Sequence, residues 1–281
     1  MNASKKRSIG QAFAATVAAA VLSLAAFPAQ ANLQLRIQDV NAANVVVATI
    51  LICDNNIGVG CLPGGDTNIT AEVITVDTTL VNAILAAAGS KFTFASAGAN
   101  DNIATATTLA VINSNFQVSV GTGAQQSLVI EASRDGWLIP VGNPRTLTNG
   151  PSAVMTQTTG NITSQGFNDG TNALFGTQFA TAASVFVAGV GPLCTPLTQG
   201  GVSTCNDLTT LNGINESNPY SLSNRQTVSS PATDGPPLST TYPANDAATK
   251  FATPQAPEPA TLLLMGAGLA ALGFGRRRWN S

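Results

Sequence analysis

The residue types of this chain restrict the chemistry that it could perform. None of the 281 residues is a histidine, which excludes a Ser-His-Asp or Cys-His arrangement, a His-ligated metal and a His general base. A carboxylate pair remains, since two Asp or Glu side chains suffice for glycoside hydrolysis. The acids on or beside predicted strands are Glu72, Asp77, Glu131 and Asp135. Because nothing in their spacing selects a pair, we expect no catalytic residues and no enzymatic activity.

Two acidic loops offer oxygen atoms of the kind that calcium prefers. They are Asp54-Asn55-Asn56 and Asn168-Asp169-Gly170-Thr171-Asn172, and calcium takes roughly six to eight oxygen ligands. Neither loop matches an EF-hand or a nonapeptide calcium repeat. Asp and Asn are also common in turns that bind no metal. We therefore expect ordinary turns here, with no metal and no cofactor.

The four cysteines form two local groups, Cys53 with Cys61 and Cys194 with Cys205. Four cysteines allow three ways of pairing, and the local pairing closes the shortest loops. A metal site is the alternative use of four thiols, but the spacings are not those of zinc sites and the chain has no histidine. Because disulfides persist in oxidising compartments outside the cytosol, we expect two local disulfides if the chain is exported.

The first 31 residues have the three parts of a secretory signal peptide. Three basic residues at positions 5–7 precede an apolar stretch from about residue 12 to 27. Ala29 and Ala31 place small side chains at positions −3 and −1 of a cut before Asn32. An uncleaved N-terminal anchor is the alternative. The pattern predicts export across an inner membrane and processing by signal peptidase.

The chain ends in a second targeting pattern. Pro257-Glu258-Pro259 precedes an apolar run of 15 residues, Ala260 to Phe274, and three arginines follow, Arg276, Arg277 and Arg278. As a helix the run would extend about 22 Å, against a hydrocarbon core of about 30 Å, so it enters a bilayer but spans it poorly. The arginines would hold the C-terminus in the cytoplasm. A permanent membrane anchor is the alternative to a tail that is removed.

This order of motif, short transmembrane helix and arginine cluster resembles the PEP-CTERM sorting signal of proteins exported by Gram-negative, exopolysaccharide-making bacteria. The resemblance covers about residues 255–279, a segment type also catalogued as the C-terminal region of ice-binding proteins. It implies that exosortase, a membrane-embedded cysteine transpeptidase, recognises Pro257, Glu258 and Pro259 and removes the tail. The protein would then stay only transiently in the inner membrane and end at the outer cell surface or outside the cell.

The charge of the mature chain excludes one class of partner. Without the signal peptide and the terminal arginines, six basic and 14 acidic residues remain, for a net charge of −8. The six cations are scattered and form no basic patch, which argues against nucleic acid as a partner. Charged residues make up only 9% of the chain, so its surface must consist largely of Thr, Ser, Asn, Gln and Gly.

Alternating apolar and polar residues predict strands through much of the mature chain. Residues 80–88 instead show helical spacing between a possible N-cap, Asp77, and a stop at Gly89. The fold class we expect is mainly β: one β-sandwich-like domain with one short helix, besides the N-terminal signal helix and the C-terminal hydrophobic helix. The expected strands lie at 33–38, 45–52, 71–76, 92–94, 104–112, 116–120, 128–132 and 184–190.

The remaining segments are expected to be turns, loops and a linker. Asp135-Gly136 lies between two apolar runs, which predicts a hairpin turn. Residues 141–183 are rich in Gly, Thr, Asn and Gln and predict long loops. Residues 217–256 lose apolar periodicity and are rich in Pro, Ser and Thr, which predicts a linker. The expected domains are a signal peptide (1–31), a sandwich (32–216), this linker (217–256) and the sorting signal (257–281).

These features predict an exported, non-enzymatic protein with a structural or adhesive role in an exopolysaccharide or biofilm matrix. The alternative is a lectin-like module that binds carbohydrate by stacking sugars on Trp137, Tyr220 or Tyr242. A core position for Trp137 is the simpler interpretation. Ice binding would need a regular array of threonines, and the chain shows no repeated Thr-x-Thr ladder.

Overall fold

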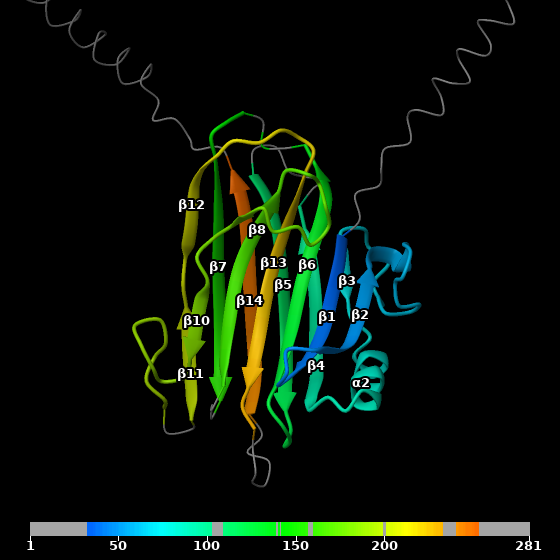
Figure 1. Ribbon diagram of the computed structural model, residues 1–281, viewed down its shortest axis with the longest axis vertical. Coiled ribbons are helices and arrows are strands. Elements are labelled where there is room, and N and C mark those ends of the chain that lie inside the picture. The colour runs from blue at the N-terminus through cyan, green and yellow to red at the C-terminus, as the bar shows by residue number, and fades with distance from the viewer. Residues whose placement is uncertain are drawn as a thin grey trace, which may run out of the picture.

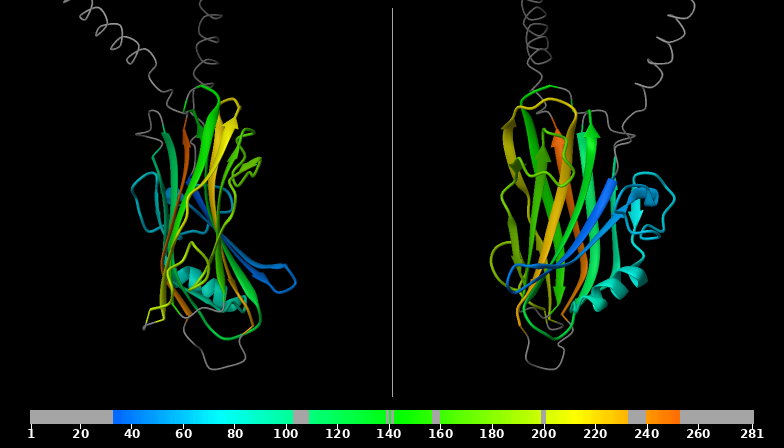
Figure 2. Two further views of the ribbon diagram at one scale, coloured as in Figure 1. Left: turned by 90° about the vertical axis from the view of Figure 1, so that its left-hand side faces the viewer. Right: turned by 45° about the vertical axis from the view of Figure 1, so that its right-hand side comes forward.

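The computed structural model describes residues 33–102, 109–138, 140, 142–156, 160–198, 201–232 and 240–252, with only the backbone described for 240–246. Two seven-stranded antiparallel sheets pack face to face (Figures 1 and 2). The prediction of a mainly β, sandwich-like domain with one short helix is therefore confirmed. The two helices expected near the chain ends lie outside the described residues.

The chain passes repeatedly from one sheet to the other. The first sheet has the order β10-β8-β13-β6-β1-β2, with β9 also paired to β8; its strands are β1 (Leu33–Asn41), β2 (Val46–Cys53), β6 (Gln126–Trp137), β8 (Asn161–Asp169), β9 (Phe179–Ala180), β10 (Ser184–Val187) and β13 (Tyr220–Ser230). The second sheet has the order β11-β7-β14-β5-β4-β3, with β12 also paired to β7; its strands are β3 (Val73–Thr75), β4 (Phe92–Asp101), β5 (Leu109–Val120), β7 (Arg145–Thr156), β11 (Val202–Asn206), β12 (Thr209–Ile214) and β14 (Thr240–Ala252).

The predicted short helix is present as α2 (Thr78–Ala87). Asp77 is its N-cap, since the side-chain Oδ1 accepts a hydrogen bond of 3.0 Å from the backbone N–H of Leu80. Val81 and Leu85 form its buried face, and Gly89 follows the helix with a φ of +76° that favours glycine. The cap and the stop inferred from the sequence are both confirmed.

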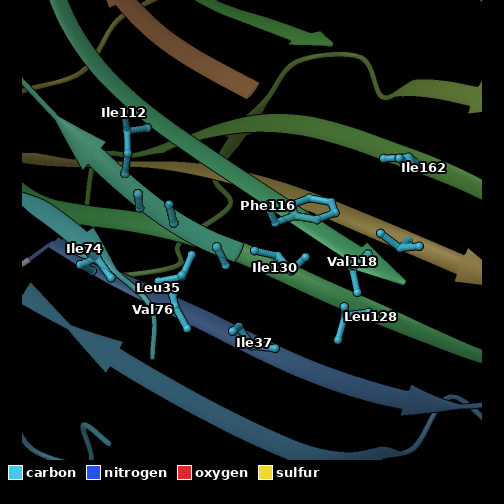
Figure 3. Packing of buried hydrophobic residues seen from close by; sticks show 14 of the residues in the cluster. Leu35, Ile37, Ile74, Val76, Ile112, Phe116, Val118, Leu128, Ile130 and Ile162 are labelled. Atoms are coloured by element: carbon cyan, nitrogen blue, oxygen red, sulfur yellow. The ribbon is translucent and has the colours of Figure 1, made fainter. Parts of the chain in front are cut away.

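One part of the interior is an apolar zone formed mainly by β1, β6, β3 and β5. Alternate residues of β1, among them Leu35 and Ile37, are fully buried as the period-2 pattern predicts. They face side chains of the second sheet such as Ile74 and Val118 (Figure 3). This apolar zone supplies the hydrophobic burial that a sandwich requires.

A second part of the interior is polar. Six buried side chains hydrogen-bond to one another between the sheets, and we call them the polar band: Ser114, Asn149, Ser164, Asn224, Gln226 and Thr249. Asn224 is at its centre and joins three partners of the second sheet: its Nδ2 donates to Asn149 Oδ1 (2.9 Å) and Thr249 Oγ1 (2.8 Å), and its Oδ1 accepts from Ser114 Oγ (2.9 Å). Asn149 Nδ2 also donates to Ser164 Oγ (3.2 Å) and Gln226 Nε2 to Ser114 Oγ (3.0 Å). The band is thus a connected network, as buried polar groups require.

The predicted linker at 217–256 is wrong for most of its length. Its residues form β13 and β14, and each of these strands lies inside a sheet between two neighbours. The sequence misled because β13 buries Ser and Asn side chains beside Leu222 and Val228, so the segment looks hydrophilic although it is interior. The sandwich extends to Ala252, the last residue that the structure describes.

The predicted long loops at 141–183 are also wrong in part, because the segment contains β7 and β8. Burial alternates along all of β7 and along the first half of β8, but polar side chains such as Asn149 and Ser164 occupy inward positions. A period-2 apolar pattern is therefore missing from strands that have period-2 burial. The polar band hides these strands from a hydrophobicity argument.

The predicted hairpin turn at Asp135-Gly136 is wrong. Both residues lie within β6, where they face the single residue Ser221 on β13 between two regular pairs, Trp137 with Tyr220 and Arg134 with Leu222. Gly136 has a φ of +75°, so the two residues form a β-bulge. The positive φ that glycine permits serves a bulge here, and not the reversal that the sequence suggested.

Candidate functional site

Glu131, one of the four candidate catalytic acids, is fully buried between two arginines. Arg36 on β1 and Arg225 on β13 are its cross-strand neighbours. Arg36 Nη2 lies 2.5 Å from Glu131 Oε2 and Arg225 Nη2 lies 3.0 Å from Oε1. Both carboxylate oxygens are thus occupied by guanidinium groups, and the residue joins three strands of the first sheet.

Two phenylalanines cover this ion triad. The guanidinium carbon of Arg36 lies 4.1 Å from the ring centroid of Phe175, and that of Arg225 lies 4.7 Å from the centroid of Phe167. The segment after β8 therefore folds over the outer face of the first sheet, where the backbone N–H of Phe175 also donates to Ser133 Oγ (2.8 Å). Cation–π contacts of this kind hold arginines in place and shield their partner from water.

The other three candidate acids have separate structural positions. Asp77 caps α2, Asp135 lies in the bulge of β6, and Glu72 precedes β3 with a φ of +70° while its backbone N–H donates to Asp54 Oδ2 (2.8 Å). Their positions favour structural roles and supply no argument for an acid and base pair. The absence of enzymatic activity stays a prediction.

The aromatic residues considered for sugar stacking are mostly inside the sandwich. Trp137 and Tyr220 have no exposed surface. The Tyr220 ring packs edge-on against Phe251, with centroids 5.0 Å apart, and burial raises the pKa of its hydroxyl. Neither ring can serve as a platform for a sugar. The side chain of Tyr242 lies outside the described residues.

The first loop considered for calcium is held by hydrogen bonds from backbone N–H groups to the carboxylates of Asp66 and Asp54. Asp66, which is buried, accepts hydrogen bonds from the backbone N–H groups of Asn55 (3.0 Å), Asn68 (2.9 Å) and Thr75 (3.0 Å). Asp54 accepts in turn from Glu72 N–H. These carboxylates are occupied by backbone N–H donors, most of them distant in sequence, so hydrogen bonds that hold the loops together account for the acidic residues. The role of Asp66 had no sequence signal that we recognised.

The second such loop begins with the last two residues of β8. Asp169 Oδ1 accepts from Thr171, through the backbone N–H (2.7 Å) and the hydroxyl (2.5 Å). Asn172 Oδ1 accepts from Gly136 N–H (2.7 Å), which ties the loop to the bulge of β6. Within the described part of the chain, no three acidic or Cys side chains gather as metal ligands. This loop is also explained as a turn.

The cysteines pair locally, as expected. Cys53 is bonded to Cys61, and Cys194 to Cys205. The first bridge ties the loop after β2 back to that strand, and Leu62 N–H donates to Leu51 O (2.7 Å) beside it. The second bridge fixes the segment before β11. The two disulfides therefore stabilise two loops.

Sequence reasoning missed a polar cluster at the end of the sandwich where β7 begins. Arg145 is buried beside Tyr220 and Phe251, with its guanidinium carbon 5.4 and 5.6 Å from their ring centroids. Burial raises the pKa of the nearby Glu216 carboxyl, while Asn168 and the charge of Arg145 oppose the rise. No single motif identifies this cluster, because its members come from four separate segments.

Two buried groups of opposite charge, Lys91 and Asp39, lie near the opposite end of the sandwich, and the sequence did not reveal them either. Lys91 is almost fully buried, and its Nζ donates to the backbone oxygens of Ser230 (3.3 Å) and Pro231 (2.8 Å). Burial lowers the pKa of this amine and raises that of the buried Asp39 carboxyl, and each charge partly opposes the shift of the other. The amine thus joins the start of β4 to the end of β13.

The predicted signal-cleavage residues, the Pro257-Glu258-Pro259 motif and the arginine cluster lie outside the described residues. The structure nevertheless places their attachment points, since β1 begins and β14 ends at the same end of the sandwich (Figure 1). Five residue steps separate Ala252 from Pro257, which limits the distance between their Cα atoms to about 18 Å. No helix of the described residues is long and apolar enough to cross a bilayer.

Comparison with known families identifies the tail. Residues 255–278 match the model of the PEP-CTERM protein-sorting motif, which confirms the resemblance inferred for this segment. The match does not extend to the sandwich. A comparison with curated proteins finds no match for the chain. The motif indicates a protein that exosortase sorts to the cell surface or the extracellular space of a Gram-negative bacterium.

Proposed function

We propose that the sandwich is a structural or adhesive component of the exopolysaccharide matrix that surrounds the producing cell, and that it has no enzymatic activity. The observation that carries this proposal is the sorting motif, matched at residues 255–278, close in sequence to Ala252, the last described residue of the sandwich. The structural positions of the described candidate acids support the proposed lack of enzymatic activity. The small number of charged residues makes the surface compatible with a hydrated polysaccharide, which supports a location in the matrix.

The short connection between the sandwich and the motif restricts where the sandwich lies while the tail is processed. With at most about 18 Å between Ala252 and Pro257, the folded sandwich lies next to the enzyme that recognises the motif. The end of the sandwich that carries Arg145 faces the membrane during sorting. The opposite end, with α2, faces away from it and is the part that would first meet the matrix.

The processing part of the proposal is tested by intact mass. Protein is recovered from the medium of strains with and without exosortase, with and without reduction. We expect a chain that begins at Asn32, lacks Arg276–Arg278 and contains two disulfides, and this species should be missing without exosortase. A released chain that still carries the arginines in the normal strain would contradict sorting by removal of the tail.

The matrix part is tested by deletion and complementation. Loss of the gene should reduce the amount of cell-associated matrix, and the wild-type gene should restore it. The cells should express a double variant, Pro257→Ala with Pro259→Ala, but this variant should not restore the matrix. Pro254→Ala, one residue before the matched segment, should restore it. An unchanged matrix in the deletion strain would contradict a matrix role while leaving the sorting result intact.

The lectin-like alternative is separated by binding. The burial of Trp137 and Tyr220 removes the two described aromatic side chains that we had considered for sugar stacking. A structural or adhesive component should show no retention on a column of the purified exopolysaccharide that free sugar competes away. Strong retention that free sugar competes away would favour the lectin-like module instead.

A further inference from the structure

The chain contains two Asn-Gly pairs, Asn149-Gly150 and Asn212-Gly213. An asparagine before a glycine can lose its amide without an enzyme, because the backbone nitrogen of the glycine attacks the side-chain carbonyl carbon. Glycine favours this attack, since it has no side chain that obstructs the nitrogen and its backbone reaches conformations closed to other residues. The asparagine side chain must also be free to turn toward its own backbone, and water must reach it. The structure gives the two pairs opposite surroundings.

Asn149 is held in place inside the polar band. It has no exposed surface, its Oδ1 accepts from Asn224 Nδ2 (2.9 Å) and Thr249 Oγ1 (3.1 Å), and its Nδ2 donates to Ser164 Oγ (3.2 Å). Its backbone lies in β7 with paired strands on both sides, β12 and β14. Turning the amide toward Gly150 would break these side-chain bonds at a position closed to solvent. We therefore expect Asn149 to stay intact.

Asn212 lies at the surface, on β12. Within the described structure β12 pairs with β7 alone. The register of this pairing shifts between Leu211 and Ile214. Asn212 and Gly213 therefore face a single residue of β7, Thr146, in a β-bulge. Both bulge residues are exposed, and a Cβ added to Gly213 would meet no atom within 4 Å beyond its chain neighbours. Water and the side chain of Asn212 thus have room to move here.

Two further features of the bulge favour the attack. Gly213 has a φ of +79°, so the regular extended backbone is broken next to Asn212. The hydroxyl of Thr146 donates a hydrogen bond to Asn212 Oδ1 (2.9 Å). Negative charge develops on this oxygen when the nitrogen attacks, and a donor that is already in place stabilises it. Thr146 therefore activates the amide of Asn212.

We propose that Asn212 is a site of spontaneous modification in the exported protein. The backbone nitrogen of Gly213 gives up its proton and forms a bond with Cγ of Asn212, and the side-chain nitrogen takes up a proton and leaves as ammonia. Water then opens the resulting cyclic imide at either of its carbonyl groups, which yields aspartate or isoaspartate. The complete sequence of steps consumes one water molecule and releases one ammonia molecule.

The modification changes one edge of the second sheet. Either product adds a negative charge to a mature chain of net charge −8. Isoaspartate also lengthens the main chain by one carbon atom, which an edge strand accommodates at a bulge more easily than an interior strand does. The exported protein should therefore accumulate more acidic forms with age. This inference does not depend on a role in the matrix.

Incubation of the protein recovered from the medium tests the proposal. The folded protein is kept in water labelled with heavy oxygen, at neutral and at mildly alkaline pH, and peptide mass spectrometry measures labelled aspartate and isoaspartate at both positions. We expect Asn212 to react at least about tenfold faster than Asn149, and faster at alkaline pH because the attacking nitrogen must lose its proton. In urea, where both residues are exposed, their rates should become similar. Protection of Asn212 in the folded protein as strong as that of Asn149 would overturn the proposal.

Variants test the local features of the site. Thr146→Val removes the hydroxyl and should slow the reaction about fivefold, whereas Thr146→Ser keeps the donor and should react like the wild type. Asn212→Gln is the matched control, because the ring that its longer side chain would have to form closes much more slowly. Far-ultraviolet circular dichroism and the urea midpoint check that each variant is folded.

Two results with these variants would count against the proposal. A Thr146→Val protein that reacts as fast as the wild type would overturn the activation by the hydroxyl. Acidic forms that appear as fast in Asn212→Gln as in the wild type would arise at another residue and would overturn the assignment to Asn212. Loss of the acidic forms in Asn212→Gln alone, with the Thr146→Ser protein unchanged, is the result that we expect.

Discussion

The two parts of the sandwich interior are held together by different interactions. In the apolar zone, side chains such as Leu35, Ile37 and Ile130 pack across the sheets without polar groups. In the polar band, Asn224 and its neighbours bond across the same space. Apolar packing tolerates a change of partner, but a buried hydrogen bond does not. The apolar zone therefore contributes most to burial, and the band is suited to determining which strands face one another.

The largest effect is expected at the centre of the polar band. Asn224→Ala removes the partner of Asn149, Thr249 and Ser114 and leaves several buried polar groups unpaired, which should lower the free energy of unfolding by about 4 kcal/mol. Urea unfolding measures the loss. If the loss is under about 1 kcal/mol, water or rearranged side chains replace the network, and the band does not determine the register.

A comparable truncation in the apolar zone gives the contrast. Ile130→Ala removes a fully buried side chain and should cost about 3 kcal/mol through lost burial and a cavity. Its unfolding should remain a single transition, because neighbouring apolar side chains can shift toward the gap. Asn224→Ala should in addition disturb the amide resonances of both sheets near the band. Equal spectral changes in the two variants would remove the distinction between the zones.

Gly166 on β8 tests how closely the sheets approach at the band. A Cβ at this position would lie 2.8 Å from Thr249 Oγ1 and 3.1 Å from Asn149 Cβ. Gly166→Ala should therefore cost about 2 kcal/mol by overpacking, measured by urea unfolding. Gly150→Ala is the control, since its Cβ would meet only Leu208 Cδ1, at 3.5 Å. A stable Gly166→Ala variant would mean that the sheets can separate here at little cost.

The smallest effect is expected outside both zones, at Glu216. Because burial raises the pKa of this carboxyl in the folded state, the folded protein binds more protons than the unfolded chain between the usual carboxyl pKa and the raised value. This contribution to stability is present at pH values below the usual pKa and is lost as the pH rises through the raised one. Glu216→Gln should flatten that part of the profile of unfolding free energy against pH. An unchanged slope would show that Glu216 is not its source.

The contrast between the zones also explains which elements could be predicted. β1, β2 and α2 lie in or beside the apolar zone, and alternation, a cap and a glycine stop were sufficient to locate them. β7, β8 and β13 place Asn, Ser or Gln at inward positions, so their hydrophobic pattern was too weak and they were interpreted as loops or linker. Polar residues are favourable inside only when partners on other strands satisfy them, and those partners are distant in sequence.

The candidate functional residues also fall into two groups, those that the sequence indicated and those that it did not. The sorting motif depends on a contiguous order of residue types, and the family model confirms it at 255–278. Arg145 with Glu216, Lys91 with Asp39, and the pairing of Glu131 with Arg36 and Arg225 join residues far apart along the chain. No spacing rule within one segment could have indicated these contacts.

The sequence by itself determined the absence of histidine chemistry, the local pairing of the cysteines, the mainly β class, the capped helix and the sorting motif, because each depends on composition or on neighbours along the chain. Only the tertiary structure decided that residues 220–230 and 240–252 are interior strands, that Asp135-Gly136 is a bulge, and that Tyr220 is covered, whereas the core position of Trp137 was already the simpler interpretation of the sequence. The physical reason is that the free energy of burying a polar residue depends on partners from the opposite sheet, which come together only when both sheets have formed.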